Sequence, residues 1–263
     1  MRLRETLERA AGRHTSPRRP GLRRLGLVTV GLLAYGCASV PRVQDRGEII
    51  RQILPSTVQL RCERSNGGRR AASGIVLASD STSQRSWVLT TRHFLDPPDA
   101  QEVYVRTPGR KDRVKAVVTA VSPDLDLAVL EVGGLALPPV RLKDLVRLGD
   151  EVWVLGFPWG RQLTVASGVV SQVGSDDGDS ALEGPARMVD VSVSQGASGG
   201  GVFDAASGAL VGIVEGYRTA RVASRDAPTG YVEIPVAGET TVISTELIRR
   251  FLVAAGLEGF IAP

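Results

Sequence analysis

The chain has 263 residues and a mass of 27.9 kDa, with 43% hydrophobic and 23% charged residues. This size and composition suit one all-β globular domain with appendages and exclude disorder over the whole chain. The formal net charge of +4 would suit a nucleic-acid partner, but residues 1–24 hold eight arginines and two glutamates and so carry +6 alone. The rest of the chain carries −2, so no nucleic-acid partner is expected.

The N-terminal arm has the pattern of an export signal. Arginines precede an uncharged apolar run over residues 25–36, which is shorter than the about 20 residues that span a bilayer and typical of a signal-peptide core. The run ends at Cys37, and this junction resembles a lipobox, although Ala34 stands where leucine is preferred. We expect a lipoprotein-type signal over residues 1–37, lipidation of Cys37, and a linker over 38–47. An ordinary cleaved signal and a short core helix are the alternatives.

From about residue 48 the chain reads as many short strands separated by turn residues. Such spacing, with strands rich in β-branched residues, predicts a sandwich or barrel. Helical periodicity is clear only over residues 45–54 and from a Ser244 N-cap to a Gly256 stop. The predicted strands lie at 74–77, 87–90, 103–105, 114–121, 127–132, 152–155, 163–173, 188–193 and 209–214.

Only two cysteines occur, Cys37 and Cys62. Val58, Leu60 and Cys62 share one face of a predicted strand, which indicates a buried small hydrophobic side chain. A disulfide between the two cysteines is the alternative. Neither a Cys/His cluster nor an acidic calcium loop is present in the sequence, so neither a metal nor a cofactor is expected.

Ser198 lies in a glycine-rich stretch, Gly196-Ala197-Ser198-Gly199-Gly200. A serine at such a tight turn can present its hydroxyl at the surface, while the N–H groups of Gly196 and Ser198 converge as an oxyanion hole. A plain glycine-rich hairpin turn is the alternative. The stretch therefore makes Ser198 a candidate nucleophile.

A nucleophilic serine needs a base and an orienting acid. His93 follows an apolar strand and is the only histidine outside the N-terminal arm, which contains His14. Asp126 directly precedes an apolar strand, and Asp124 competes with it at the same parity. The alternatives are a structural histidine and a solvated acid at a strand start.

These segments, in the order His93, Asp126, Ser198, resemble the trypsin-like serine proteases, in the HtrA/Deg-like branch. The resemblance implies two six-stranded β-barrels with a short C-terminal helix over residues 48–256, followed by a tail over 257–263. It also implies a His93–Asp126–Ser198 triad. The matching segments lie at 72–76, 88–93, 126–130, 148–152, 156–160, 165–171 and 196–200.

The chain departs from this family at several positions. Ala197 stands where the family has Asn or Asp, so activation through an ion pair with a newly cut N-terminus is not expected. Gly201-Val202 replaces the usual proline-containing sequence. No PDZ domain is expected to follow.

The resemblance also places the primary substrate pocket. Its base lies six residues before the nucleophile, at Ser192, and its walls at Thr241, Val242 and Ile243. An uncharged base gives no partner for a substrate lysine or arginine, so cleavage after small or medium aliphatic residues is expected.

The resulting expectation is a serine endopeptidase that hydrolyses unfolded or damaged proteins of the bacterial envelope through an acyl-enzyme. Its polypeptide substrates are its expected partners, and lipidated Cys37 would hold it on the outer membrane, facing the periplasm. The alternative is a catalytically silent binding or scaffold module with the same fold. An esterase of the α/β-hydrolase type would place the serine before the histidine in the chain, and the order here excludes it.

Overall fold

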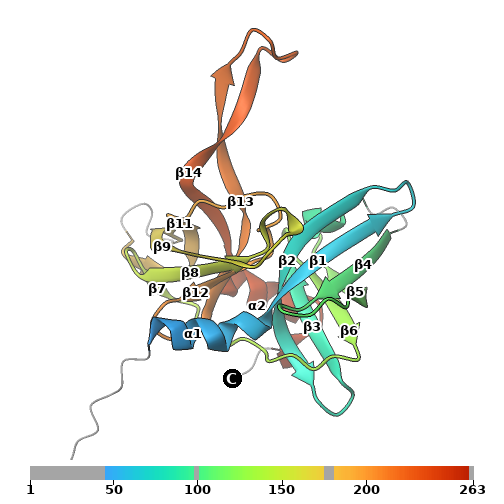
Figure 1. Cartoon of the computed structure of the whole chain (residues 1–263). Helices are drawn as coiled ribbons and strands as arrows, with labels where there is room; N and C mark the ends of the chain where they lie inside the picture. Colours follow the sequence, from blue (N-terminus) through green and yellow to red (C-terminus); the bar gives the residue numbers. More distant parts are fainter. Residues whose placement is uncertain (1–44, 98–100, 175–180, 261–263) are drawn as a thin grey trace, which may run out of the picture. The chain divides into compact units, whose positions relative to one another are not determined.

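The computed structural model describes residues 45–97, 101–174 and 181–260; the expected signal segment and Cys37 lie outside them. Two closed antiparallel barrels of six strands each follow one another along the chain (Figure 1). With the short C-terminal helix α2 (Thr245–Ala254), they confirm the predicted fold class. The first barrel has the strand order β1 (Thr57–Arg64), β2 (Arg69–Asp80), β3 (Arg85–Thr90), β6 (Ala128–Gly133), β5 (Val114–Val121) and β4 (Gln101–Arg106). The second has the order β11 (Ala186–Val189), β14 (Tyr231–Ser244), β13 (Leu210–Ala223), β12 (Gly201–Asp204), β8 (Glu151–Gly156) and β9 (Thr164–Val173).

Short helices and one small sheet complete the described chain. Both predicted helices are confirmed, as α1 (Arg46–Ile53) and as α2, whose N-cap Ser244 accepts a hydrogen bond from the N–H of Leu247 at 3.5 Å. Across the described ranges, no helix combines the length and the apolar character needed to cross a membrane. The remaining elements are η1 (Leu54–Ser56), η2 (Arg92–Leu95), β7 (Val146–Arg147), η3 (Pro158–Gly160), β10 (Glu183–Gly184) and η4 (Glu258–Phe260).

Each barrel has its own apolar interior, built from the alternating inward side chains of its strands. Cys62 belongs to the interior of the first barrel, is 0% exposed, and places its Sγ 2.7 Å from Oε1 of Gln101. Burial raises the pKa of this thiol above its usual value. The interpretation of Cys62 as a buried small hydrophobic side chain is confirmed.

A third apolar cluster joins the two barrels. Ile75, Leu89 and Leu127 of the first barrel pack in one cluster with side chains of the second barrel and with α2. The second barrel contributes Leu155, Phe203, Leu210, Ile213 and Ile243, and α2 contributes Ile248, Phe251 and Leu252. Burying about 100 Å² of apolar area stabilises a structure by about 2.5 kcal/mol, so this cluster fixes the junction between the barrels.

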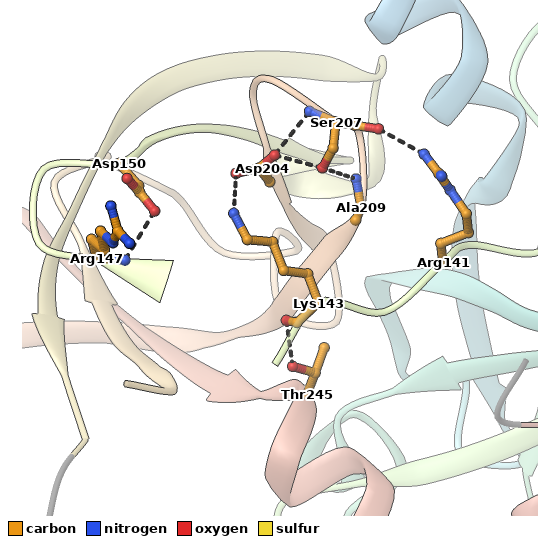
Figure 2. Close-up of polar contacts among 8 residues, drawn as sticks. All are labelled: Arg141, Lys143, Arg147, Asp150, Asp204, Ser207, Ala209 and Thr245. Atoms are coloured by element: carbon orange, nitrogen blue, oxygen red, sulfur yellow. Dashed lines mark hydrogen bonds and ion pairs between the residues drawn. The ribbon is translucent and has the colours of Figure 1, made fainter. Parts of the chain in front are cut away.

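The segment that connects the barrels is bound to the second one (Figure 2). Lys143 Nζ lies 2.7 Å from Oδ1 of Asp204, and the Lys143 carbonyl accepts a hydrogen bond from Thr245 Oγ1 at 2.8 Å. Asp204 Oδ2 accepts from the N–H of Ser207 at 2.8 Å and also from its hydroxyl. The connection is therefore attached both to the β12–β13 turn and to the start of α2.

Two segments of the second barrel differ from the sequence prediction. The strand predicted over residues 188–193 ends at Val189, because β11 is irregular and bulges against β9. The strand predicted over 209–214 continues to Ala223, and with β14 it forms a long hairpin that stands out from the barrel (orange to red in Figure 1). The outer part of this hairpin packs neither face in a core, so its sequence is polar and lacks the alternating apolar pattern that predicts a strand.

Candidate active site

His93 and Asp126 are joined by two hydrogen bonds. The His93 Nδ1 lies 2.6 Å from Oδ2 of Asp126, and the His93 backbone N–H donates to Oδ1 at 2.8 Å. His93 lies in η2, directly after β3, while Asp126 immediately precedes the segment that enters β6, the neighbour of β3. Because one contact binds the ring and the other the backbone, Asp126 fixes the orientation of the imidazole.

The turn that carries Asp126 is itself tied to η2. Arg92 donates through Nη1 to the carbonyls of Ser122 and Pro123, at 3.0 and 2.7 Å. Partial burial raises the pKa of Asp126, but the bonds from His93 outweigh it, and the net pKa lies below the usual value. Asp126 is therefore ionised at neutral pH and available to stabilise an imidazolium.

The loop that carries Ser198 depends on two glycines with positive φ. Gly196 has φ +88° and Gly199 has φ +79°, a region that other residues rarely adopt. A Cβ on Gly196 would lie 2.8 Å from the Phe157 carbonyl oxygen, and one on Gly199 would lie 2.2 Å from the Ser73 carbonyl oxygen. The glycine-rich stretch is thus required for a tight loop packed against both barrels.

Two N–H groups of this loop have no internal acceptor. The N–H groups of residues 197, 199 and 200 donate to the carbonyls of Ser194, Val214 and Ala197, respectively. Within the described part of the chain, no hydrogen bond uses the N–H of Gly196 or of Ser198. These two free donors are the ones predicted for an oxyanion hole.

The carbonyl of Gln195 sets the direction of one of these donors. It accepts a hydrogen bond from the N–H of Trp159, in η3, at 2.6 Å. Because the C=O and N–H of a trans peptide point in opposite directions, the Gly196 N–H points away from η3. Trp159 makes this contact with φ +56°, and sequence reasoning had no signal for it.

Ser73, on β2, connects this loop to the first barrel. Its hydroxyl donates to the Gly196 carbonyl at 2.8 Å and accepts from the Phe157 N–H at 2.8 Å, and its N–H donates to the Ser198 carbonyl at 2.9 Å. Ser73 is 0% exposed. Sequence reasoning included Ser73 only in a matching segment, because a buried serine on a strand carries no local signal of its contacts.

One cavity of about 790 Å³ contains the candidate nucleophile and base on its walls. His93, Gly196 and Ser198 all line it. Asp126 is reached through His93. The other lining residues are Arg61, Cys62, Glu63, Arg69, Arg70, Ala71, Ala72, Phe94, Trp159, Gly160, Gln195, Glu215, Gly216 and Tyr217.

The four residues predicted for the substrate pocket lie elsewhere. Ser192 is exposed, and its Oγ accepts from the N–H of Gly238 at 3.2 Å. Thr241 is half-buried and pairs with Met188, whereas Val242 and Ile243 are buried in the barrel interior and the junction cluster, respectively. None of the four is among the described residues that line the cavity.

Metal chemistry has no obvious ligand set here. In residues 45–97, 101–174 and 181–260, no group of three His, Cys, Asp or Glu side chains is placed to hold an ion. The groups that the cavity offers are a hydroxyl, a carboxylate-bound imidazole and two free N–H donors. These are the kinds of group that acyl transfer to a serine uses.

The sequence profile of the trypsin-like peptidase domain matches residues 72–213, more than half of the chain. The chain belongs to this family. The matched range includes His93, Asp126 and Ser198. The match begins within β2 and ends within β13, so β1 of the first barrel and β14 of the second lie outside it.

Curated relatives of this peptidase domain have the name "probable periplasmic serine endoprotease DegP-like". The protein from Ectopseudomonas mendocina is 34% identical over 158 residues, which cover 57% of this chain and 31% of the relative. The one from Pseudomonas fluorescens is 30% identical over 183 residues, covering 67% of this chain and 36% of the relative. The chain thus spans about a third of the length of these relatives.

Solved structures of similar fold are also proteases. The HtrA-type protease AlgW with tripeptide superposes with a TM-score of 0.60 at 22% identity, covering 82% of this chain and 64% of that one. The serine endoprotease from Yersinia pestis gives a TM-score of 0.59 at 23% identity, covering 82% and 68%. At this identity the likeness establishes the two-barrel fold.

Proposed function

We propose that the protein is a serine endopeptidase. Ser198 attacks the carbonyl carbon of the scissile bond, and His93 takes its proton and then donates it to the leaving amine. Asp126 holds the imidazole and stabilises its charged form, and the N–H groups of Gly196 and Ser198 bind the oxyanion. The acyl-enzyme is then hydrolysed by water along the same route in reverse.

One observation carries this proposal: a His93 imidazole held by Asp126 lines the same cavity as Ser198, and the N–H groups of Gly196 and Ser198 have no acceptor among the described residues. A substrate strand also has a place to bind. The pairing of β12 with β13 begins at Gly201, the first residue of β12, which lies opposite Ile213. Beyond this pair, Glu215, Gly216 and Tyr217 of β13 line the cavity. This strand edge is therefore available to pair with an extended polypeptide.

Hydrolysis of an unfolded protein such as casein tests the function. Ser198→Ala and His93→Ala are expected to lose about 10⁴-fold or more in kcat, because nucleophile and base act as one unit. Thermal melting of each variant provides the folding control. Equal hydrolysis by wild type and Ser198→Ala would exclude Ser198 as the nucleophile, and no hydrolysis by folded wild type would favour a silent binding module.

We also propose that the substrates are unfolded or damaged envelope proteins and that lipidated Cys37 anchors the enzyme to the outer membrane. The periplasmic names of the relatives support an envelope location. Cys37→Ser is expected to release the protein from membrane fractions, because the acyl chains of a lipoprotein supply the anchor. Native protein without lipid by mass spectrometry, and soluble in the periplasm, would contradict the anchor.

For specificity, we propose cleavage after small or medium aliphatic residues, the preference that the resemblance to the trypsin-like family implies through an uncharged Ser192. Ser192 does not line the cavity that holds Ser198, so the preference rests on the resemblance alone. The cleavage sites of digested casein, mapped by mass spectrometry, are expected to follow Val, Ala, Leu or Ile. A profile dominated by Arg and Lys would contradict this preference.

A further inference from the structure

Three arginines of the first barrel line the cavity that holds Ser198 and His93. Arg61 lies on β1, and Arg69 and Arg70 lie at the start of β2, all exposed. We call these three residues the arginine wall. Guanidinium groups are positively charged in proteins.

Within the described ranges, the hydrogen bonds of the arginine wall go to backbone carbonyls. Arg61 donates to the backbone carbonyl of Gly160 at 3.2 Å, and Arg70 donates to the carbonyls of His93 and Asp96 at 2.9 and 2.6 Å. Across the described residues, no carboxylate forms an ion pair with any of the three. An acidic ligand would therefore find free donors here.

Two acidic residues of the described chain line the cavity: Glu215, on β13 of the second barrel, and Glu63, which lies beside the wall and already binds another cation. Glu63 lies directly across the β1–β2 pair from Arg69, the position from which a carboxylate could neutralise it. Its carboxylate instead binds Arg113, whose guanidinium also lies over the ring of Tyr104, 4.2 Å from the ring centroid. Arg69 is thus left facing the cavity without its cross-strand partner.

The position of the wall indicates which half of a substrate it meets. Ser198, which would hold the acyl half in the proposed mechanism, precedes β12 of the second barrel, and the free edge of β13 at Glu215 to Tyr217 belongs to the same barrel. His93, which would protonate the leaving amine, belongs to the first barrel, as does the arginine wall, and Arg70 donates to the His93 carbonyl. We therefore expect the leaving half of the substrate to run along the wall.

We propose that the preferred substrates carry Asp or Glu on the C-terminal side of the scissile bond, where Arg61 and Arg69 bind their carboxylates. This inference rests on the proposed endopeptidase function and defines its substrate class. Charge-assisted contacts between guanidinium and carboxylate groups are both stronger and more directional than neutral ones, so the wall selects among leaving halves. Arg70 acts more indirectly, since its guanidinium is bound to the backbone that carries His93.

Matched internally quenched peptides test the proposal. All share one cleavable acyl half with an aliphatic residue at the cut. Their leaving halves contain two Asp, two Asn or two Lys residues, and a fourth peptide carries two Asp residues on the acyl side instead. We expect kcat/KM for the first peptide to exceed that for the Asn peptide by about five- to tenfold at low salt, with the Lys peptide slowest. In 1 M NaCl, where the Debye length is about 3 Å, the ratio should approach one.

The variant Arg61→Gln/Arg69→Gln connects the preference to the wall. It is expected to bring the Asp-to-Asn ratio close to one, whereas Arg250→Gln, an exposed arginine on α2, should keep the wild-type ratio. The proposal would be overturned if wild type gave equal kcat/KM values on the Asp and Asn peptides. It would also be overturned if Asp residues on the acyl side raised kcat/KM as much as Asp residues on the leaving side, or if the double variant kept the wild-type Asp-to-Asn ratio.

A measurement of peptide affinity distinguishes the absence of an acidic preference from the absence of peptidase activity. Fluorescence anisotropy with Ser198→Ala measures affinity for the same peptides without catalysis. Tighter binding of the leaving-side Asp peptide, abolished by the two arginine substitutions, supports the wall even if wild type hydrolyses nothing. Hydrolysis of all peptides with no preference in rate or binding overturns the wall and leaves the endopeptidase standing.

Discussion

The hydroxyl of Ser73, in the first barrel, donates a 2.8 Å hydrogen bond to the carbonyl of Gly196, in the oxyanion loop of the second. The same hydroxyl accepts from the N–H of Phe157, which precedes η3. η3 in turn binds the Gln195 carbonyl. One buried hydroxyl therefore binds both the loop that contains Gly196 and the residue that leads into η3, and η3 sets the direction of the Gly196 N–H.

Ser73→Ala is expected to lower kcat by about 10- to 100-fold, because two groups that position the oxyanion loop lose a partner at about 1–3 kcal/mol each. Ser86→Ala is the matched control. Ser86 is also 0% exposed on the first barrel, donates to the Leu135 carbonyl at 2.8 Å and accepts from the Leu137 N–H at 2.9 Å. Both variants should melt at lower temperature, but only Ser73→Ala should lose kcat. Equal kcat values in the two variants would exclude a positioning role.

Gly196→Ala is expected to reduce kcat by about 10²- to 10³-fold, the cost of losing one oxyanion donor. The added Cβ would lie 2.8 Å from the Phe157 carbonyl oxygen, so the loop must move. Gly230→Ala supplies the control, since Gly230 has φ +75° but nothing within 4 Å of an added Cβ. Steady-state kinetics should separate the two variants; retention of full activity in Gly196→Ala would argue against this donor.

Asp126→Asn is expected to lower kcat by about 10⁴-fold, because an amide cannot hold the imidazole in the required tautomer or stabilise its charge. Asp124→Asn should remain within a few-fold of wild type, since Asp124 is exposed and only Asp126 binds His93. The comparison uses peptide hydrolysis at neutral pH. A larger loss in Asp124→Asn than in Asp126→Asn would reverse the assignment of the acid.

Stability should depend on pH through Asp204. Burial raises the pKa of this carboxyl, but the bond from Lys143 and those from Ser207 outweigh it and lower the pKa below 3.8. Because the pKa is lower in the folded state, the stabilisation is complete above about pH 4 and is lost as the pH falls through the folded pKa. Asp204→Asn should lose about 1–3 kcal/mol of unfolding free energy at pH 7.

The difference between wild type and Asp204→Asn should then narrow below about pH 4. Denaturant melts at several pH values measure it, with the exposed Asp112→Asn as the control. A difference that stays constant from pH 7 to pH 3 would show that the ionised carboxylate of Asp204 is not the source of the stability.

Much of the fold could be predicted from sequence because local composition and capping residues mark its elements. The strand over residues 114–121 was predicted from its β-branched residues and matches its bounds, although only Ala116 in it is buried. The helix after Ser244 was predicted from its N-cap and also matches closely. The outer part of the β13–β14 hairpin was missed, because Val222, Val232 and Ile234 are exposed and alternate with charged residues. Without a core to face, such a strand has no periodic signature.

Some residues of the candidate site could likewise be predicted from the sequence, and others could not. His93, Asp126 and Ser198 were identified because their chemistry limits the choice to a few residues. Ser73 contacts Gly196, which lies 123 positions further along the chain, and Arg61 contacts Gly160, which lies 99 positions further. Only the closure of two barrels against each other brings such residues together, and single-sequence patterns do not report tertiary proximity.

Labelling with a fluorophosphonate probe tests the central claim most directly, because the probe forms a covalent bond only with a serine activated by its base and oxyanion hole. Wild type, Ser198→Ala and the folded control Ser86→Ala are incubated with the probe, and the modified residue is mapped by mass spectrometry. If Ser198 is the activated nucleophile, we expect stoichiometric labelling at Ser198 in wild type and in Ser86→Ala, and none in Ser198→Ala. Absence of labelling in folded wild type, or equal labelling in Ser198→Ala, would contradict this assignment.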